Sequence, residues 1–245
     1  MAHLAGINFE RGTQTYETVH TRGTRNVVEA ADGAGVSKVI LSSFLRARPS
    51  CGSAYHESKW EAEEIVRRSG LDYTVFKPGV TYGRGDHMLE HISRSLATVP
   101  VFGLIGFSER RLRPLAIEDL VKIMTASLTE NRLSETTVAV MGPEEITLKE
   151  AIRRIGEVVD RDPLMIPVPI LFHYGFARVQ ERIMEIPVTT AAQVRILAEG
   201  VTEPAPPGVC EPLPEDLKPD QSFSMERIDR GLSEIRPYGV SDLRL

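Results

Sequence analysis

The sequence has few cysteines, few aromatic residues and no excess of positive charge. The two cysteines, Cys51 and Cys210, lie far apart and share no ligand-like spacing with histidines. This argues against a disulfide scaffold and predicts a reducing, cytoplasmic location. The formal net charge of -5 argues against a protein that holds nucleic acid through a net positive field. We therefore expect no nucleic-acid partner.

The sequence also lacks a long hydrophobic run. The richest apolar stretch, PLMIPVPILFHYGF at 163–176, is interrupted by three prolines and is shorter than the roughly 18 apolar residues that indicate a membrane-spanning helix. The first residues, MAHLAGINFERG, contain no basic segment followed by an apolar one, so they do not resemble a signal peptide. We expect a soluble protein with no membrane span.

What the sequence does contain is an alternation of short β-rich runs and amphipathic helical runs. The expected strands are HLAG at 3–6, KVILSS at 38–43, LDYTVFKP at 71–78 and TTVAVMG at 136–142. The expected helices cover 15–33, 54–69 (with Trp60, Ile65 and Val66 as its buried face), 87–98 and 118–128. Strands and helices in this order predict a parallel sheet with helices on its faces, an α/β fold.

The composition changes after Gly142. Thr147 with Glu150, and Thr190 with Gln193, each predict a capping box at the start of a helix. Residues 203–219 contain six prolines, which predicts an irregular strap, and a last helix is expected at 225–235. The sequence thus predicts an α/β layer at 1–142 and a small, mostly helical C-terminal lobe at 143–245, with some sheet elements shared.

One segment, SAYHESKWEAEE at 53–64, carries a possible catalytic pattern. Tyr55 and Lys59 are one helical turn apart, so their side chains are neighbours on one face. An ammonium beside a phenol is expected to lower the tyrosine pKa from about 10 toward working pH. Such a phenol can exchange a proton with a substrate oxygen while a hydride moves at carbon. Ser42 and Ser43 end the preceding strand, at the sheet edge where open parallel sheets bind ligands.

The order of several segments resembles a known family. LSS at 41–43, YHESK at 55–59 and LDYTVFKPGVTYGRGD at 71–86 together resemble the short-chain dehydrogenase/reductase superfamily, in its extended and atypical branches. HLAG resembles the fourth strand of that family, and GPEEITLKEAIRRIGEVV at 142–159 the start of its substrate lobe. The stretch 164–200 looks most like the atypical group that includes NmrA-like proteins and the dinucleotide-binding accessory subunit of respiratory complex I.

This resemblance implies a Rossmann-like layer that binds NAD or NADP and transfers hydride to or from a small-molecule substrate. Tyr55 would be the acid/base, and Lys59 its pKa-lowering partner, which also holds the nicotinamide ribose. Ser43 would hold the substrate oxygen, with Ser42 as the alternative. The implied cofactor-binding residues are Ala5, Gly6, Ser42, Tyr55, Lys59, Pro78, Gly79 and Val80. His20 stands where extended members often carry an asparagine.

The glycine-rich turn that holds the pyrophosphate in this family is missing. The glycine pair at 33 and 35 ends a helix, and the pair at 83 and 85 lacks a third glycine. The chain starts at what resembles the fourth strand, so we expect an N-terminally truncated Rossmann layer with HLAG as an exposed edge. Three explanations are ranked in this order: the natural chain extends upstream, a partner chain or second copy covers the edge, or the chain is a fragment that binds rather than catalyses.

Two functional hypotheses follow. The first is an NAD(P)-dependent oxidoreductase or epimerase-like enzyme, active if the missing half is supplied. The second is a non-catalytic scaffold or accessory subunit on a degraded dinucleotide-binding fold. The sequence does not distinguish NAD from NADP and does not indicate the substrate. HMLEH at 87–91 matches a zinc-peptidase pattern, but we interpret it as an ordinary helix start and predict no metal site.

Overall fold

The computed structural model describes residues 1–232 and 235–242. The chain divides into two compact units, each assembled from three separate segments. The first unit comprises Met1–Gly79, Glu118–Met141 and Glu203–Asp220, and the second comprises Val80–Ile117, Gly142–Thr202 and Gln221–Leu245.

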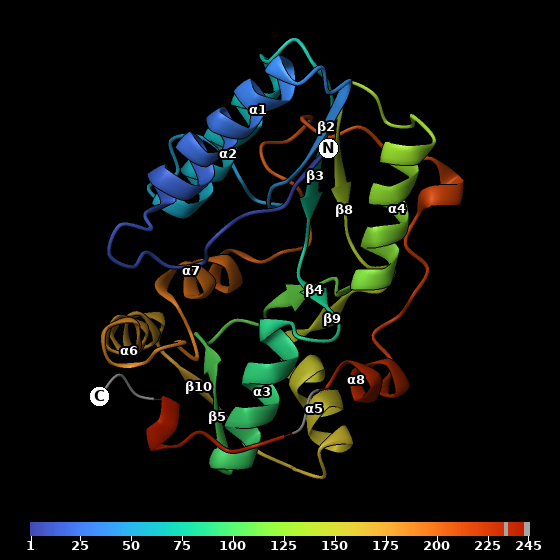
Figure 1. Cartoon of the computed structure of the whole chain (residues 1–245). Helices are drawn as coiled ribbons and strands as arrows, with labels where there is room; N and C mark the ends of the chain where they lie inside the picture. The colour runs from blue at the N-terminus through green and yellow to red at the C-terminus, as the bar shows by residue number, and fades with distance from the viewer. Residues whose placement is uncertain (233–234, 243–245) are drawn as a thin grey trace. The chain divides into compact units, whose positions relative to one another are not determined.

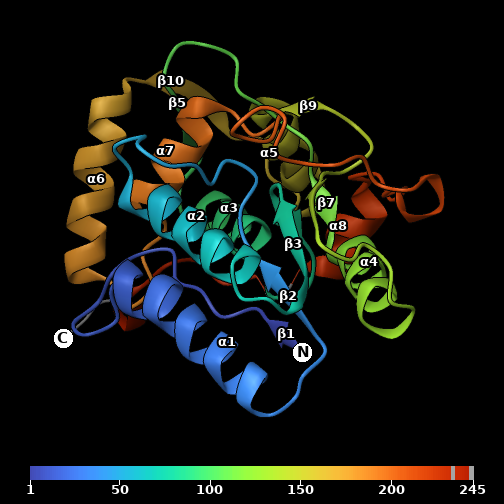
Figure 2. The same cartoon turned by 90° about the horizontal axis from the view of Figure 1, so that it is seen from above.

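The first unit is built on a four-stranded parallel sheet in the order β1-β2-β3-β8. The strands are β1 (Ala2–His3), β2 (Lys38–Ser42), β3 (Asp72–Pro78) and β8 (Thr136–Val140). Helices α1 (Gly23–Gly33) and α2 (Ala54–Arg67) lie on one side of the sheet and α4 (Ile117–Thr129) lies on the other (Figures 1 and 2). The predicted α/β, Rossmann-like parallel sheet is confirmed.

The central strands are apolar on both faces, which explains the helices on both sides. Val39, Ile40, Val75 and Phe76 are all at most 1% exposed. Strands buried on both faces of a parallel sheet show continuous apolar runs of this kind. Five side chains form the core between the sheet and the helices α1 and α2: Val28, Leu41, Ala62, Val66 and Val75.

Helix α2 buries a more polar face than its sequence predicts. Val66 is fully buried as expected, but Trp60 and Ile65 are only partly buried. The row Tyr55, Lys59 and Glu63 is buried instead. Two of these polar side chains, Lys59 and Glu63, have hydrogen-bonding partners inside the unit, and such partners offset the cost of burial.

The expected helix at 15–33 is divided. Its first part, η1 (Glu17–Arg22), is a π-helix, and α1 continues from it. A π-turn inserts an extra residue, and such turns occur often at functional sites. His20 lies in this turn and is buried.

The proline-rich strap at 203–219 is irregular, as predicted, and its backbone is tied to the first unit. The N–H of Ala205 donates to the carbonyl of Leu45 at 3.0 Å, and the N–H of Glu211 donates to Thr137 at 2.8 Å. The strap contains one short 3-10 turn, η2 (Glu215–Leu217).

The second unit is mostly helical. Its helices are α3 (His87–Thr98), α5 (Leu148–Val158), α6 (Ile170–Ile183), α7 (Ala191–Glu199), α8 (Met225–Gly231) and the 3-10 turn η3 (Val240–Asp242). Three two-stranded sheets pair β4 (Thr81–Tyr82) with β7 (Leu115–Ala116), β5 (Val101–Ile105) with β10 (Leu164–Val168), and β6 (Arg111–Leu112) with β9 (Ile146–Thr147). The two units do not follow the predicted division after residue 142: residues 80–117 of the predicted α/β layer lie in this unit, and residues 203–220 of the predicted lobe lie in the first unit.

Capping sets the start of two of these helices. Thr190 and Gln193 form the predicted reciprocal capping box. The Thr147 hydroxyl accepts the N–H of Glu150 at 3.0 Å, while the Glu150 side chain pairs with Arg153 and Arg154. The predicted last helix ends at Gly231, and residues 233–234 of that prediction lie outside the described residues.

Two negative observations hold for residues 1–232 and 235–242. No helix there has both the length and the apolar content needed to cross a membrane, and no three or more His, Cys, Asp or Glu side chains are placed to hold a metal ion. The two histidines of HMLEH instead stack on each other, with ring centroids 5.2 Å apart. His91 is further hydrogen-bonded to the Tyr238 hydroxyl at 2.5 Å, and burial lowers its pKa to about 4.

Candidate functional site

A tight loop before α2 places Tyr55 in the first turn of that helix. Ser50 and Gly52 adopt positive φ angles of 51° and 72°, which bend the chain back toward the helix start. The Glu57 carboxylate accepts the N–H groups of Cys51 and Gly52, each at 2.8 Å. An acidic side chain in the first turn that binds loop N–H groups stabilises the helix start.

Tyr55 is held in an aromatic cage and its hydroxyl is free. The side chain is 7% exposed, and its ring centroid lies 5.5 to 5.8 Å from those of Tyr16, His20, Phe44 and His56. The hydroxyl has no hydrogen-bond partner among the residues that the structure describes, although buried phenols usually have one. A ligand oxygen would provide that partner.

The expected lowering of the Tyr55 pKa is wrong for the free protein. Burial in the aromatic cage raises the pKa of the phenol above its ordinary value of 10.0. Removal of water from around the phenolate therefore outweighs any effect of the lysine one turn away. The Tyr55 phenol is therefore neutral at working pH.

Lys59 lies under the loop that follows β1. It is 8% exposed, and its Nζ makes one long hydrogen bond, of 3.4 Å, to the carbonyl of Ser42. Burial lowers its pKa to about 8, against an opposing effect of Glu63. A Cβ atom at Gly6 would lie only 2.8 Å from Nζ, so only glycine leaves the ammonium undisturbed there. An ammonium has three donors, and those left free by the contact with Ser42 can bind a ligand.

His20 connects this loop to the start of α2. Its Nε2 accepts the N–H of Ile7 at 3.1 Å, so Nδ1 carries the proton and donates to the Ser58 hydroxyl at 2.9 Å. That hydroxyl donates to the carbonyl of Tyr55 at 3.0 Å. Burial, assisted by the charge of Lys59, lowers the pKa of His20 to about 3. The neutral imidazole therefore fixes the loop and the helix start in one arrangement.

Ser43 takes part in a second, buried cluster. Its hydroxyl donates to the Glu63 carboxylate in a short hydrogen bond. The same carboxylate pairs with Lys77 Nζ at 2.8 Å and with Arg67 at 2.6 Å. Glu63 and Lys77 are completely buried, and Lys77 also donates to the carbonyl of Ala47 at 2.8 Å. The hydroxyl of Ser43 is thus already engaged.

Sequence reasoning missed this cluster, although two signals for it exist. Glu63 lies one turn beyond Lys59 and two turns beyond Tyr55, so it belongs to the same helix row. Lys77 interrupts an otherwise apolar, β-rich run. A lone charge in a buried strand requires a buried partner, and Glu63 is that partner.

For most of the remaining predicted site residues, the structure shows backbone hydrogen bonds. Ala5 is exposed beside Gly6. Pro78 ends β3 and its carbonyl accepts the N–H of Leu45 at 2.9 Å, while the N–H of Gly79 donates to Val140 at 2.9 Å. Val80 belongs to the second unit, where its carbonyl accepts the N–H of Leu115 at 2.9 Å. The contacts join Gly6, Lys59 and the Ser42 carbonyl directly, and His20 and Ser58 connect them to Tyr55.

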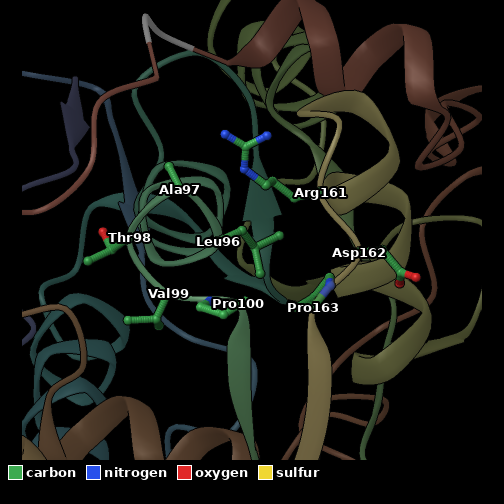
Figure 3. A pocket seen from close by; sticks show the side chains of 8 residues that line it. All are labelled: Leu96, Ala97, Thr98, Val99, Pro100, Arg161, Asp162 and Pro163. Atoms are coloured by element: carbon green, nitrogen blue, oxygen red, sulfur yellow. The ribbon is translucent and has the colours of Figure 1, made fainter.

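A cavity of about 180 Å³ lies elsewhere, in the second unit (Figure 3). It is lined by Leu96, Ala97, Thr98, Val99, Pro100, Arg161, Asp162 and Pro163. None of the predicted site residues lines this cavity, so it is separate from the site around Tyr55.

Replacing Lys59 with methionine is expected to stabilise the protein below pH 8. The native pKa of about 8, against an ordinary value of 10.5, corresponds to roughly 3 kcal/mol of penalty for the buried ammonium. Below pH 8 both folded and unfolded states carry the proton, so the penalty is complete. Between pH 8 and 10.5 only the unfolded state keeps it, so the wild-type protein gains stability as the pH rises. Urea unfolding at a series of pH values measures the difference.

Lys122→Met is the matched control, because Lys122 is exposed on α4 of the same unit. It should change the free energy of unfolding by less than about 0.5 kcal/mol at every pH. A Lys59→Met variant that is less stable than wild type at pH 7, or equally affected at pH 7 and 10, would contradict the burial penalty.

The sequence and the fold were compared with known proteins. Residues 5–95 match the model of a family described as NAD(P)H-binding. Ceramide reductase of Caulobacter vibrioides is 26% identical over 167 residues, which cover 68% of this chain and 52% of that protein. NADH dehydrogenase [ubiquinone] 1 alpha subcomplex subunit 9, mitochondrial, of Mus musculus is 26% identical over 238 residues, covering 94% of this chain and 63% of the relative.

A solved structure agrees with the fold. MoeE5 in complex with UDP-glucuronic acid and NAD matches with a TM-score of 0.58 at 18% identity, covering 69% of this chain and 64% of MoeE5. The Rossmann-like fold is thereby confirmed, and the family match confirms the predicted cofactor class, NAD or NADP. The chain spans only 52% and 63% of the length of the two curated relatives.

Proposed function

We propose that this chain, which resembles the extended, NmrA-like branch of the short-chain dehydrogenase/reductase superfamily, is an NAD(P)-dependent oxidoreductase or epimerase-type protein whose proton-transfer centre is Tyr55 with Lys59. One observation carries the proposal: the hydroxyl of Tyr55, a side chain that is only 7% exposed, has no partner among the described residues, and a partly unsatisfied, buried ammonium lies one turn along the same helix. Titratable groups in largely buried side chains that keep unused hydrogen-bonding capacity are typical of ligand-binding and catalytic sites.

The residues around Lys59 fit a nucleotide. Gly6 leaves the ammonium open to a ligand on the loop side, where any larger residue would crowd Nζ. Lys59 holds ribose hydroxyls with its free donors, and Ala5 and Gly6 line the same position. NAD(P), when bound, supplies the hydride donor or acceptor. Pro78, Gly79 and Val80 remain predicted contacts to the nicotinamide.

Tyr55 moves the proton. Since burial keeps its phenol neutral, Tyr55 donates a proton to a substrate oxygen in the reductive direction and takes it back in the oxidative direction. The ammonium of Lys59 stabilises the phenolate that forms during this step. The substrate oxygen is held by Ser42 rather than by Ser43 in this proposal, because the Ser43 hydroxyl already donates to Glu63.

Nucleotide binding tests this function directly. NADH or NADPH at about ten times its dissociation constant should stabilise the protein by about 1.4 kcal/mol, measured as a rise in melting temperature. The residues named here contact the nicotinamide half, so reduced nicotinamide mononucleotide should also stabilise the protein, and adenosine monophosphate should not. Lys59→Met should remove the effect of both nicotinamide ligands.

The protein is then assayed for turnover with whichever nucleotide stabilises it. Small ketones, aldehydes and nucleotide sugars form the substrate panel, the last because MoeE5 was solved with UDP-glucuronic acid. If millimolar NAD(H) and NADP(H) leave the melting temperature unchanged, the enzymatic proposal is wrong.

A non-catalytic accessory subunit is the second candidate. The mouse subunit of NADH dehydrogenase matches 94% of this chain, so the likeness extends over both units. This candidate predicts no turnover with any member of the panel.

The partner of this protein and its cellular location also remain proposals. β1 is the edge strand of the sheet and pairs with β2 alone within the described part of the chain, so a partner chain or second copy that covers this edge would satisfy its free backbone groups. A cytoplasmic location rests on the sparse cysteines alone.

A further inference from the structure

Helix α6 presents an unusually apolar face to solvent. Phe172, Phe176, Val179 and Ile183 follow the spacing i, i+4, i+7 and i+11, which places them in one row along the helix. They are between 47% and 71% exposed, and Leu171 beside them is 82% exposed. We call these five residues the α6 stripe. At 1.5 Å per residue the row from 172 to 183 is about 17 Å long.

The inner face of α6 packs against the rest of the second unit, so the α6 stripe is not part of that unit's core. Ala177 and Gln180 are buried, and Gln180 accepts the N–H of Thr189 at 2.9 Å. Glu181 accepts the N–H of Ala191 at 2.8 Å, at the start of α7. His173 bonds the carbonyl of Leu104 in β5 at 3.2 Å. α6 and α7 lie side by side in both views (Figures 1 and 2).

The charges on α6 favour one kind of partner. Arg178 and Arg182 form a second exposed row beside the stripe, and neither has an ion-pair partner among the described residues. Glu181, the one acidic residue of the helix, is engaged at α7 on the inner face. The outward face therefore combines two phenylalanines, three aliphatic side chains and two free cations.

We propose that α6 is an interfacial helix that docks the protein on an anionic lipid bilayer. A helix with an apolar row that includes phenylalanine, and with arginines beside it, lies in the plane of a bilayer surface with its apolar row among the acyl chains. The arginines then reach lipid phosphates. The helix lies on the membrane and does not cross it. This proposal is independent of nucleotide binding at Tyr55.

Vesicle flotation of the full chain tests the proposal. Vesicles of equal parts phosphatidylcholine and phosphatidylglycerol should carry the protein, and pure phosphatidylcholine vesicles should carry much less. The double variant F172S/F176S should lower the partition coefficient by tenfold or more, as expected for removal of buried apolar area. The double variant R178Q/R182Q should lower it by about fivefold for each arginine at low salt.

V121S is the matched control, because Val121 is also exposed (52%) but lies on α4 in the first unit. It should leave flotation unchanged. All variants alter exposed side chains, and an unchanged melting temperature verifies that they fold. The proposal is overturned if the wild type does not float with anionic vesicles, if either α6 double variant floats like wild type, or if light scattering shows a dimer that F172S/F176S dissociates, which would assign the stripe to a second copy of this chain.

Discussion

Replacing Glu63 with alanine should lower the free energy of unfolding by about 3–5 kcal/mol, the cost of breaking a buried ion pair by removing one partner. Glu63 and Lys77 are both completely buried and 2.8 Å apart. Without the carboxylate, the Lys77 ammonium keeps the carbonyl of Ala47 and the face of the Trp60 ring but no counter-charge, and the Ser43 hydroxyl loses its acceptor. Urea unfolding at pH 7 measures the change.

Glu64→Ala provides the matched control on the same helix. Glu64 pairs with Arg67 at 2.7 Å and with Arg68 at 2.6 Å, but it is 27% exposed, so water replaces its partners. Ion pairs near the surface contribute about 0–1 kcal/mol, and Glu64→Ala should stay in that range. Equal losses for the two variants would contradict a dominant role for burial.

A double variant separates the unpaired charge from the lost packing. Glu63→Leu combined with Lys77→Met replaces both buried charges with apolar side chains of similar volume. Such replacements are often neutral or stabilising, so the double variant should recover most of the stability lost in Glu63→Ala. If it unfolds as readily as Glu63→Ala, the loss comes from packing or from Ser43 rather than from the uncompensated ammonium.

The sheet could be predicted from the sequence because its central strands are buried on both faces. KVILSS and TTVAVMG are continuous runs of apolar and β-branched residues, and β2 and β8 follow them within two residues at either end. The division of the helix at 15–33 into two parts could not be predicted in the same way. Its apolar spacing is helical throughout, but the π-turn at Glu17–Arg22 accompanies hydrogen bonds of His20 to Ile7 and Ser58. Those partners come from other segments and leave no local signal.

The same distinction applies to the site. The spacing of Tyr55 and Lys59 is a local property of a helix, and it is enough to predict that the two side chains share one helix face. The pKa of Tyr55 depends on how much water the fold removes, which spacing does not encode, so the expected direction was wrong. Ser43 was expected to face a substrate because it ends a strand. Its hydroxyl instead binds Glu63, a residue twenty positions away along the chain.

Tyr55→Phe should lower kcat by about 10² to 10⁴-fold, the usual contribution of a positioned acid/base group, on any substrate that the wild-type protein turns over. Its stability should not fall, because the Tyr55 hydroxyl donates to no described residue and the ring packing is kept. The nucleotide-induced rise in melting temperature should also persist, since Lys59 is unchanged. Steady-state kinetics and thermal unfolding of the same preparation provide both measurements.

Tyr16→Phe is the matched control for Tyr55→Phe, because the two tyrosine rings are neighbours, with centroids 5.7 Å apart. The Tyr16 hydroxyl donates to the carbonyl of Asn8 at 2.9 Å, so its removal should cost about 1 kcal/mol of stability and leave kcat within a few-fold of wild type. The two variants delete the same atom type from adjacent rings and should have opposite effects: one loses turnover and keeps stability, the other the reverse. Retention of turnover in Tyr55→Phe would remove the phenol from the reaction and leave Lys59 as a nucleotide-binding residue only.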